Sequence, residues 1–260
     1  MKFVDSHAHI NSEEFQDDRD QVIARAFQED IQAILCPIEL TEPKNLQIGL
    51  ELIEKHDNII AAAGVHPHNA KDFQTEAAST LKHLASEKNI LAVGEIGLDF
   101  HYNFSSPEEQ RTAFRSQLNL AQDLGLPVVI HSRNAANEIA AAVEKEDFSN
   151  GGVLHCFTEN LEFAEHMLKY GFLISFSGIL TYPNAQSLRD IAKKIPLIKT
   201  LIETDSPYLT PVPYRGRIKR NEPVYVKEVA KTLANIQHTS LEEVAQVTSQ
   251  NFASLFPIEI

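Results

Sequence analysis

The chain has 260 residues, of which 43% are hydrophobic and 23% are charged, a composition typical of a soluble globular protein with one large domain. Its formal net charge of −13 argues against a broad cationic surface that wraps duplex DNA, so a phosphate substrate needs local attraction. Two cysteines lack C-x-x-C spacing and no long apolar run is present, so we expect a cytoplasmic protein without a cysteine zinc site or a membrane span.

Short apolar runs rich in β-branched residues alternate along the chain with longer amphipathic segments, which is the pattern of repeated βα units. The expected strands cover residues 2–9, 32–37, 59–65, 91–97, 127–132, 152–156, 172–177 and 200–204. An α/β barrel of eight such units needs about 250 residues. The sequence therefore predicts an α/β protein with a TIM (β/α)8 barrel, formed by residues 1–260 as a single domain.

Capping signals place two helix starts within this pattern. Ser106 and Ser240 are each followed three residues later by a glutamate, as in a capping box, and Pro107 suits the first helical position. Four prolines between residues 207 and 223 predict an irregular loop after the last strand. Loops at this end of a barrel commonly contact substrate.

The first expected strand carries His7 and His9, which strand alternation would place on one face. An isolated His-x-His pair is often structural, so the pair indicates a metal only if other strands supply ligands.

Other expected strands do supply them at their ends. Glu95 is flanked by glycines in an apolar run, His131 and His155 close two further strands, and Asp205 follows the last one. A carboxylate buried in a barrel needs a partner. The nitrogen and oxygen donors of these residues suit zinc, manganese or related ions, and a bridging carboxylate suits two ions better than one. The sequence predicts a binuclear site at the C-terminal rim of the strands.

These residues resemble the TatD-related DNase family of amidohydrolase-like barrels over nearly the whole chain. The motifs that carry the resemblance are Asp5-Ser6-His7-Ala8-His9, Gly64-Val65-His66-Pro67-His68, Gly94-Glu95-Ile96-Gly97-Leu98-Asp99, His131-Ser132-Arg133, His155-Cys156-Phe157, Glu203-Thr204-Asp205-Ser206-Pro207-Tyr208 and Arg220-Asn221-Glu222-Pro223. The resemblance implies that His7, His9 and Asp205 hold one divalent ion. It implies that His131 and His155 hold the other, with Glu95 bridging, and leaves Mg²⁺, Mn²⁺ and Zn²⁺ open.

Further residues are candidates for substrate contact. The resemblance places His66 at the substrate edge, with a turn histidine as the alternative. Four cations from Arg215 to Arg220 form a local phosphate attractor in an acidic chain, although a solvated loop is the alternative for each of them. Arg133 lies two residues after the expected ligand His131 and is a further candidate for phosphate contact. The alternative role for Arg133 is an ion pair that holds the loop. Glu203 is expected to orient a histidine ligand.

The resemblance implies a metal-dependent deoxyribonuclease that acts as a 3'-5' exonuclease on single-stranded DNA, with RNA as a further substrate. Asp205 is expected to accept the proton of the attacking water. Tyr208, Tyr214 and Phe157 are candidates for base stacking. One alternative is a binuclear hydrolase of a small ester, amide or phosphoester, and another is a non-catalytic metal or nucleic-acid binding protein. We expect a monomer with no obligatory protein partner and no membrane contact.

Overall fold

The computed structural model describes residues 1–87 and 89–259. The chain divides into two compact units, one formed by Met1–Cys36 with Ile174–Ile260 and the other by Pro37–Leu173. Within the described ranges, eight parallel strands alternate with helices and follow the order β1 to β8 in the sheet. This connectivity confirms the (β/α)8 fold class that the sequence predicts.

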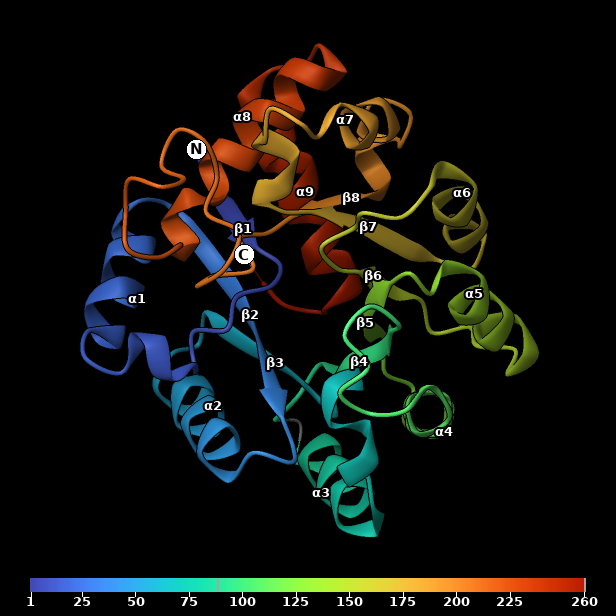
Figure 1. Cartoon of the computed structure of the whole chain (residues 1–260). Coiled ribbons are helices and arrows are strands. Elements are labelled where there is room, and N and C mark those ends of the chain that lie inside the picture. The colour runs from blue at the N-terminus through green and yellow to red at the C-terminus, as the bar shows by residue number, and fades with distance from the viewer. Residues whose placement is uncertain (88, 260) are drawn as a thin grey trace. The chain divides into compact units, whose positions relative to one another are not determined.

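The first unit contains the beginning and the end of the βα series (Figure 1). Its elements are β1 (Phe3–Asp5), α1 (Arg19–Gln28), most of β2 (Ile31–Glu39), most of β7 (Phe172–Phe176), α7 (Gln186–Ala192), β8 (Thr200–Ile202), α8 (Val226–Gln237) and α9 (Leu241–Leu255). Strand β1 pairs with β2, and β7 pairs with β8. Buried aliphatic side chains such as Val4, Ile34, Ile174 and Ile202 form its core, because these strands are apolar on both faces.

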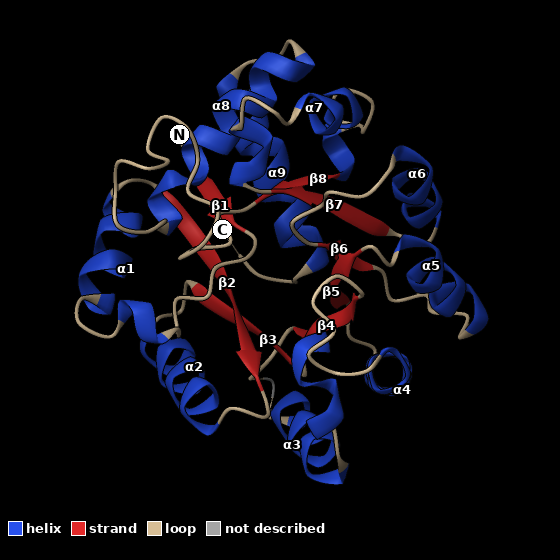
Figure 2. Ribbon diagram, viewed as in Figure 1, coloured by secondary structure: helices blue, strands red, loops and turns tan. Residues whose placement is uncertain are grey.

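The second unit contains the middle of the series. Its elements are the end of β2, α2 (Pro43–Lys55), β3 (Ile59–Gly64), α3 (Thr75–Ser86), β4 (Ala92–Asp99), α4 (Pro107–Leu124), β5 (Val128–Arg133), α5 (Ala136–Lys145), β6 (Gly152–Leu154) and α6 (Leu161–Lys169). Strand β4 pairs with β3 and β5, and β5 also pairs with β6. Figure 2 shows α3, α4 and α5 outside these strands. Val93, Ile96 and Ile130 are buried in the core of this unit.

Helix α4 begins as its sequence predicts. The Ser106 hydroxyl accepts the Glu109 main-chain N–H, and the Glu109 carboxylate accepts the Ser106 main-chain N–H. This reciprocal capping satisfies two donors that the first turn leaves without helical partners. The helix ends at Leu124, and the residue after it, Gly125, has a φ of 67° that suits a left-handed cap. Ser240 likewise accepts from Glu243 at the start of α9, so both predicted helix starts are confirmed.

Five strands end earlier than predicted, β3 and β7 by one residue and three others by two or more. Strand β1 stops at Asp5, β6 at Leu154 and β8 at Ile202, so His7, His9, His155, Glu203 and Asp205 lie in the segments that follow the strands. Regular pairing stops because side chains replace main-chain partners. The Thr204 N–H donates to the Asp5 carboxylate, and Asp205 has a φ of 53°. Conversely, β4 is longer than predicted, and Glu95 lies in its interior.

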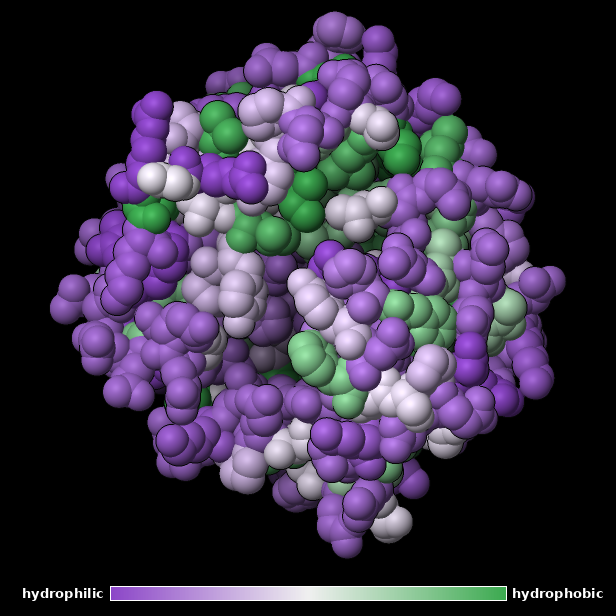
Figure 3. Space-filling model, in the orientation of Figure 1, coloured by the Kyte–Doolittle hydropathy of each residue, from purple (hydrophilic) through white to green (hydrophobic). Residues whose placement is uncertain are grey.

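Residues 207–222 form turns and irregular loop, as the four prolines predict. The face shown in Figure 3 is mainly hydrophilic, with smaller hydrophobic areas between the polar side chains. In the part of the chain that the structure describes, none of the helices combines the length and apolar character needed to cross a bilayer.

Candidate metal centre

Three ligand-type side chains converge in the first unit. The Nε2 atoms of His7 and His9 lie 3.2 Å apart, and the Asp205 Oδ1 atom lies 3.4 Å from His9 Nε2 and 3.9 Å from His7 Nε2. Ligand atoms bound to one tetrahedral ion at about 2.1 Å lie about 3.4 Å apart. The three atoms therefore have the spacing of a coordination site. The His7 and His9 rings lie together, but not on one face of a strand as predicted, because β1 ends at Asp5.

Main-chain hydrogen bonds hold this triad of His7, His9 and Asp205 in place. The Asp205 N–H donates to the His7 carbonyl over 2.9 Å, and the His9 N–H donates to the Ser206 carbonyl over 2.8 Å. The segment after β1 thus stays paired with the segment after β8, even though neither is a regular strand. Asp205 is thus held by the backbone of His7, and His9 by the backbone of Ser206, the residue after Asp205.

Asp5 anchors the same pairing from inside the core. Its carboxylate accepts hydrogen bonds from the Thr204 N–H at 2.8 Å, the Thr204 hydroxyl at 2.5 Å and the His7 N–H at 3.3 Å. Burial raises the pKa of Asp5 well above its usual value, and the charge of Glu203 adds to this rise. Glu203 is itself buried, and its N–H donates to the Phe176 carbonyl. The expected contact of Glu203 with a histidine ligand stays a prediction.

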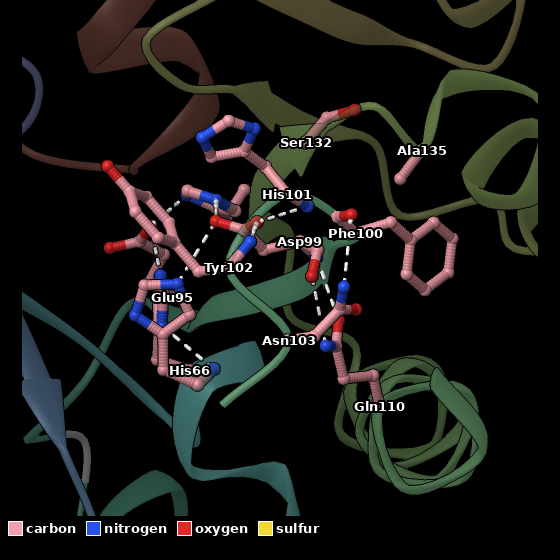
Figure 4. Close-up of polar contacts among 12 residues, drawn as sticks. His66, Glu95, Asp99, Phe100, His101, Tyr102, Asn103, Gln110, Ser132 and Ala135 are labelled. Atoms are coloured by element: carbon pink, nitrogen blue, oxygen red, sulfur yellow. Dashed lines mark hydrogen bonds and ion pairs between the residues drawn. The ribbon is translucent and has the colours of Figure 1, made fainter. Parts of the chain in front are cut away.

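The second unit gathers imidazoles around one carboxylate oxygen. Glu95 Oε1 lies 2.8 Å from His155 Nε2, 3.0 Å from His131 Nδ1 and 3.3 Å from His66 Nε2. Figure 4 shows Glu95 and His66 close together at its left. The members come from β3, β4, β5 and β6 or from the residues directly after them, so the parallel strands bring separate sequence motifs to one place. We call these four residues the Glu95 cluster.

The cluster balances its charges internally. Burial disfavours ionisation of Glu95, but the neighbouring imidazoles outweigh it and hold the pKa of this carboxyl well below its ordinary value. Burial also works against a charged His131, yet its hydrogen bonds to Asp99 and Glu95 prevail and raise the pKa of this imidazole. A raised pKa makes protons stronger competitors of a metal ion for the His131 ring.

His66 differs from the other imidazoles of the cluster. Burial lowers the pKa of His66 to about 4, against the opposing charge of Glu95, so the ring is neutral at pH 7. Its Nδ1 accepts the His68 main-chain N–H at 3.1 Å, which leaves the ring proton on Nε2. The geometry makes His66 a hydrogen-bond donor rather than a metal ligand. The Glu39 carboxylate fixes its backbone by accepting the His66 N–H at 2.9 Å.

Asp99 lies behind the cluster and connects it to the following loop. Its Oδ2 atom is 3.0 Å from His68 Nε2 and 3.2 Å from His131 Nε2, and its Oδ1 accepts the N–H groups of His101 and Tyr102 (Figure 4). Burial alone would raise the pKa of Asp99, but these hydrogen bonds hold it well below the ordinary range. Asp99 thus fixes the second nitrogen of His131, the arrangement that orients ligating histidines in metal sites.

The candidate substrate cations lie in different surroundings. The Arg133 guanidinium is exposed, with its carbon 4.9 Å from the Tyr102 ring centre, and that of Arg215 is 4.0 Å from the Tyr182 ring centre. Arg220 contacts both carboxylate oxygens of Asp18 at 2.6 and 2.7 Å and lies over the Phe15 ring. Arg220 is therefore held by structural contacts, and its role in substrate binding stays a prediction.

Several polar residues that support the site were not predicted as site residues. Gln117 of α4 accepts the Val65 N–H at 2.7 Å and donates to the Val65 carbonyl at 3.1 Å, directly before His66. Gln110 makes the same kind of double contact with Asp99. The hydrophobic pattern of an amphipathic helix does not distinguish a buried glutamine from an exposed one. For Asp5, the available signal was a carboxylate directly after an apolar run.

Both groups fit divalent ions by the chemistry of their donors. The triad offers two imidazole nitrogens and a carboxylate oxygen, and the Glu95 cluster offers the Glu95 carboxylate with His131 Nδ1 and His155 Nε2 at 3.0 and 2.8 Å from its Oε1 atom. Such mixed nitrogen and oxygen sets suit Zn²⁺, Mn²⁺ and related ions.

Comparison with known proteins gives the family. The family model described as "TatD related DNase" matches residues 4–257. The chain is 41% identical to the Escherichia coli K12 protein named "Uncharacterized metal-dependent hydrolase YcfH", with 100% of this chain and 97% of the relative covered. The chain belongs to the TatD-related DNase family. This identification confirms the resemblance inferred from the motifs.

Other relatives of this TatD-family chain extend the comparison. It is 34% identical to the Escherichia coli K12 protein named "3'-5' ssDNA/RNA exonuclease TatD", with 98% of each chain covered. The crystal structure of YJJV, a TatD homologue from Escherichia coli K12, matches with a TM-score of 0.91 and 30% identity, over 99% of this chain and 98% of that one. The chain is thus a member of a family of metal-dependent hydrolases with the same (β/α)8 fold.

Proposed function

We propose that this TatD-family hydrolase removes nucleotides from the 3' end of single-stranded DNA, and also acts on RNA, with the help of divalent ions. The observation that carries the proposal is the buried Glu95 carboxylate with His155, His131 and His66 around one oxygen. Relatives from Escherichia coli and Erwinia amylovora are named 3'-5' ssDNA/RNA exonucleases and match nearly the full chain, which supports the substrate class.

Two ions are proposed, one for each group of ligands. In the first unit, His7, His9 and Asp205 would hold one ion, and in the second unit His131, His155 and Glu95 would hold the other. Such ions supply Lewis acidity, which lowers the pKa of bound water and offsets charge on a phosphoryl group. The bridging role of Glu95, the identity of the ions and a cytoplasmic location stay predictions.

The side chains contribute proton transfer and orientation. Asp205 is the proposed acceptor of the proton from the attacking water, because its carboxylate oxygen lies 3.4 Å from His9 Nε2 and 3.9 Å from His7 Nε2, at the position proposed for the first ion. His66 is the proposed donor to a phosphoryl oxygen, since its ring is neutral and carries the proton on Nε2. Arg133 and Arg215 are the proposed phosphate contacts.

The test is cleavage of a 5'-labelled single-stranded oligonucleotide with Mn²⁺ or Mg²⁺ and with a chelator. The expected products shorten from the 3' end, only with metal, and Asp205→Asn loses most turnover while the control Asp190→Asn on the exposed face of α7 keeps it. Turnover of Asp205→Asn at the parental rate would refute its role as proton acceptor. Inactivity on every oligonucleotide, together with turnover of small phosphoesters, would replace this proposal with the small-molecule hydrolase.

A further inference from the structure

An exposed aromatic pair lies on the loop between β4 and α4. Tyr102 is 50% exposed and Phe104 is 62% exposed. Their rings are nearly parallel, with an interplanar angle of 6° and ring centres 5.6 Å apart. Two large aromatic side chains at such exposure contribute little to the core, and clustered exposed apolar surface commonly marks a binding site.

The loop that carries this pair is held firmly at both ends. At its start, Asp99 accepts the main-chain N–H groups of His101 and Tyr102. At its end, the buried Gln110 donates to the carbonyls of Asp99 and Ser105 at 3.0 Å each. Figure 4 shows Gln110 beneath the loop and Tyr102 projecting from it toward the side of Glu95 and His66. Hydrogen bonds within the protein thus hold the backbone that carries the aromatic pair, which reduces the entropy lost on binding.

One imidazole connects the pair to the Glu95 cluster. The His68 ring centre is 4.8 Å from that of Phe104 and 5.6 Å from that of Tyr102, both edge to face. On its other side, His68 is 4.3 Å from the ring centre of His66, whose Nε2 lies 3.3 Å from Glu95. A flat group on the aromatic surface is thus within a few side chains of the proposed reaction centre.

A cation completes the surface. The exposed Arg133 guanidinium lies over the Tyr102 ring, 4.9 Å from its centre, and Arg133 closes the same strand that carries His131. Exposed aromatic rings with an adjacent arginine are the combination by which proteins stack bases and contact the phosphates of single strands. A small aliphatic ester would use neither feature.

We propose that Tyr102 and Phe104, with Arg133 beside them, form a stacking subsite for one base of a single-stranded substrate. The proposal rests on the proposed function and specifies how that site selects nucleic acid. Stacking holds the substrate equally before and during reaction, so it acts on KM and leaves kcat nearly unchanged. Loss of one stacked base reduces affinity by about tenfold or more.

Binding can be measured without turnover, because the chain contains no tryptophan. The variant Phe104→Trp then reports on the subsite, and His83→Trp on the exposed face of α3 is the matched control. With Mg²⁺ present, a phosphorothioate oligothymidylate should quench Phe104→Trp fluorescence saturably. An abasic phosphorothioate oligomer of equal length should quench it weakly, and neither should affect His83→Trp. Equal quenching by the two oligomers would overturn the proposal.

Steady-state kinetics provide a second test of the stacking subsite. The double variant Tyr102→Leu with Phe104→Leu should raise KM for an oligonucleotide about tenfold or more and leave kcat within twofold. The variants Tyr102→Phe and Phe104→Tyr, which keep an aromatic ring, should have the KM of the parent. An unchanged KM in an active double variant would overturn the subsite but leave the nuclease proposal intact. Base-dependent quenching in a protein that cleaves no oligonucleotide would support the subsite and refute the nuclease proposal.

Discussion

Replacing Gly97 with alanine should damage both the stability of the second unit and its ligand group. Gly97 pairs with His131 between β4 and β5 and has a φ of +145°. A Cβ atom at this position would lie 2.0 Å from the His131 carbonyl oxygen and 2.9 Å from its carbonyl carbon. Since these contacts are with main chain, the alanine cannot fit unless the backbone of the proposed ligand His131 moves.

The size of the effect follows from two costs. A non-glycine residue in such a backbone conformation costs about 1–3 kcal/mol, and forcing extra volume into packed structure costs about 1–3 kcal/mol more. Gly97→Ala should therefore lower the free energy of unfolding by about 2–6 kcal/mol. Gly125→Ala is the control, because Gly125 has a φ of +67° but nothing within 4 Å of its added Cβ. That variant should lose about 1–2 kcal/mol.

The assay is urea denaturation of the parent and both variants without metal, followed by Mn²⁺ titration of the folded proteins. Gly97→Ala should unfold at lower urea than Gly125→Ala and should bind Mn²⁺ more weakly, whereas Gly125→Ala should bind like the parent. The reasoning fails if the two variants unfold at the same urea concentration and Gly97→Ala keeps parental affinity for Mn²⁺.

Three further outcomes are expected. Gln117→Leu leaves the Val65 N–H and carbonyl without hydrogen-bond partners, and should lower the free energy of unfolding in urea by about 2–4 kcal/mol. The control Gln47→Leu, on the exposed face of α2, should change it by about zero, and equal losses in the two variants would contradict this role of Gln117. Burial raises the pKa of the Cys36 thiol to about 12, so a thiol reagent at pH 8 should spare Cys36 and reach only the less buried Cys156 until the chain unfolds; rapid native modification of both would contradict the packing. Mn²⁺ at 100 times its dissociation constant should add about 2.7 kcal/mol and raise Tm by about 5–10 °C over chelated protein; an unchanged Tm would exclude tight binding to the folded state.

The ends of apolar runs predicted which candidate ligands lie close together, but not where the strands end. His131 and His155 converge on Glu95 as expected for neighbouring parallel strands. The boundaries of β1 and β8 were wrong because Asp5 takes over hydrogen bonds that a regular ladder would give to carbonyls. The pattern of apolar residues indicates which residues are buried. Buried residues continue beyond the point where regular hydrogen bonding between strands stops.

The contacts that sequence reasoning missed depend on tertiary structure. Tyr102 and Phe104 are two residues apart in a loop, and their stacking depends on how Asp99 and Gln110 hold that loop. For the cations from Arg215 to Arg220, the sequence predicted a contact with substrate where the structure shows an ion pair at Arg220. The composition of this segment suggested phosphate binding, yet the partner Asp18 lies 202 residues away in the chain, so the ion pair could be found only in the folded structure.

The central claim is that the Glu95 cluster supports metal-dependent hydrolysis of single-stranded DNA. The most direct test measures bound Mn²⁺ and nucleotide release on the same preparations of the parent, Glu95→Gln and the control Glu144→Gln, whose glutamate is exposed on α5. The account predicts that parent and control release nucleotides from 3' ends in proportion to bound Mn²⁺, and that Glu95→Gln loses Mn²⁺ and release together. Parental release by Glu95→Gln would contradict the account.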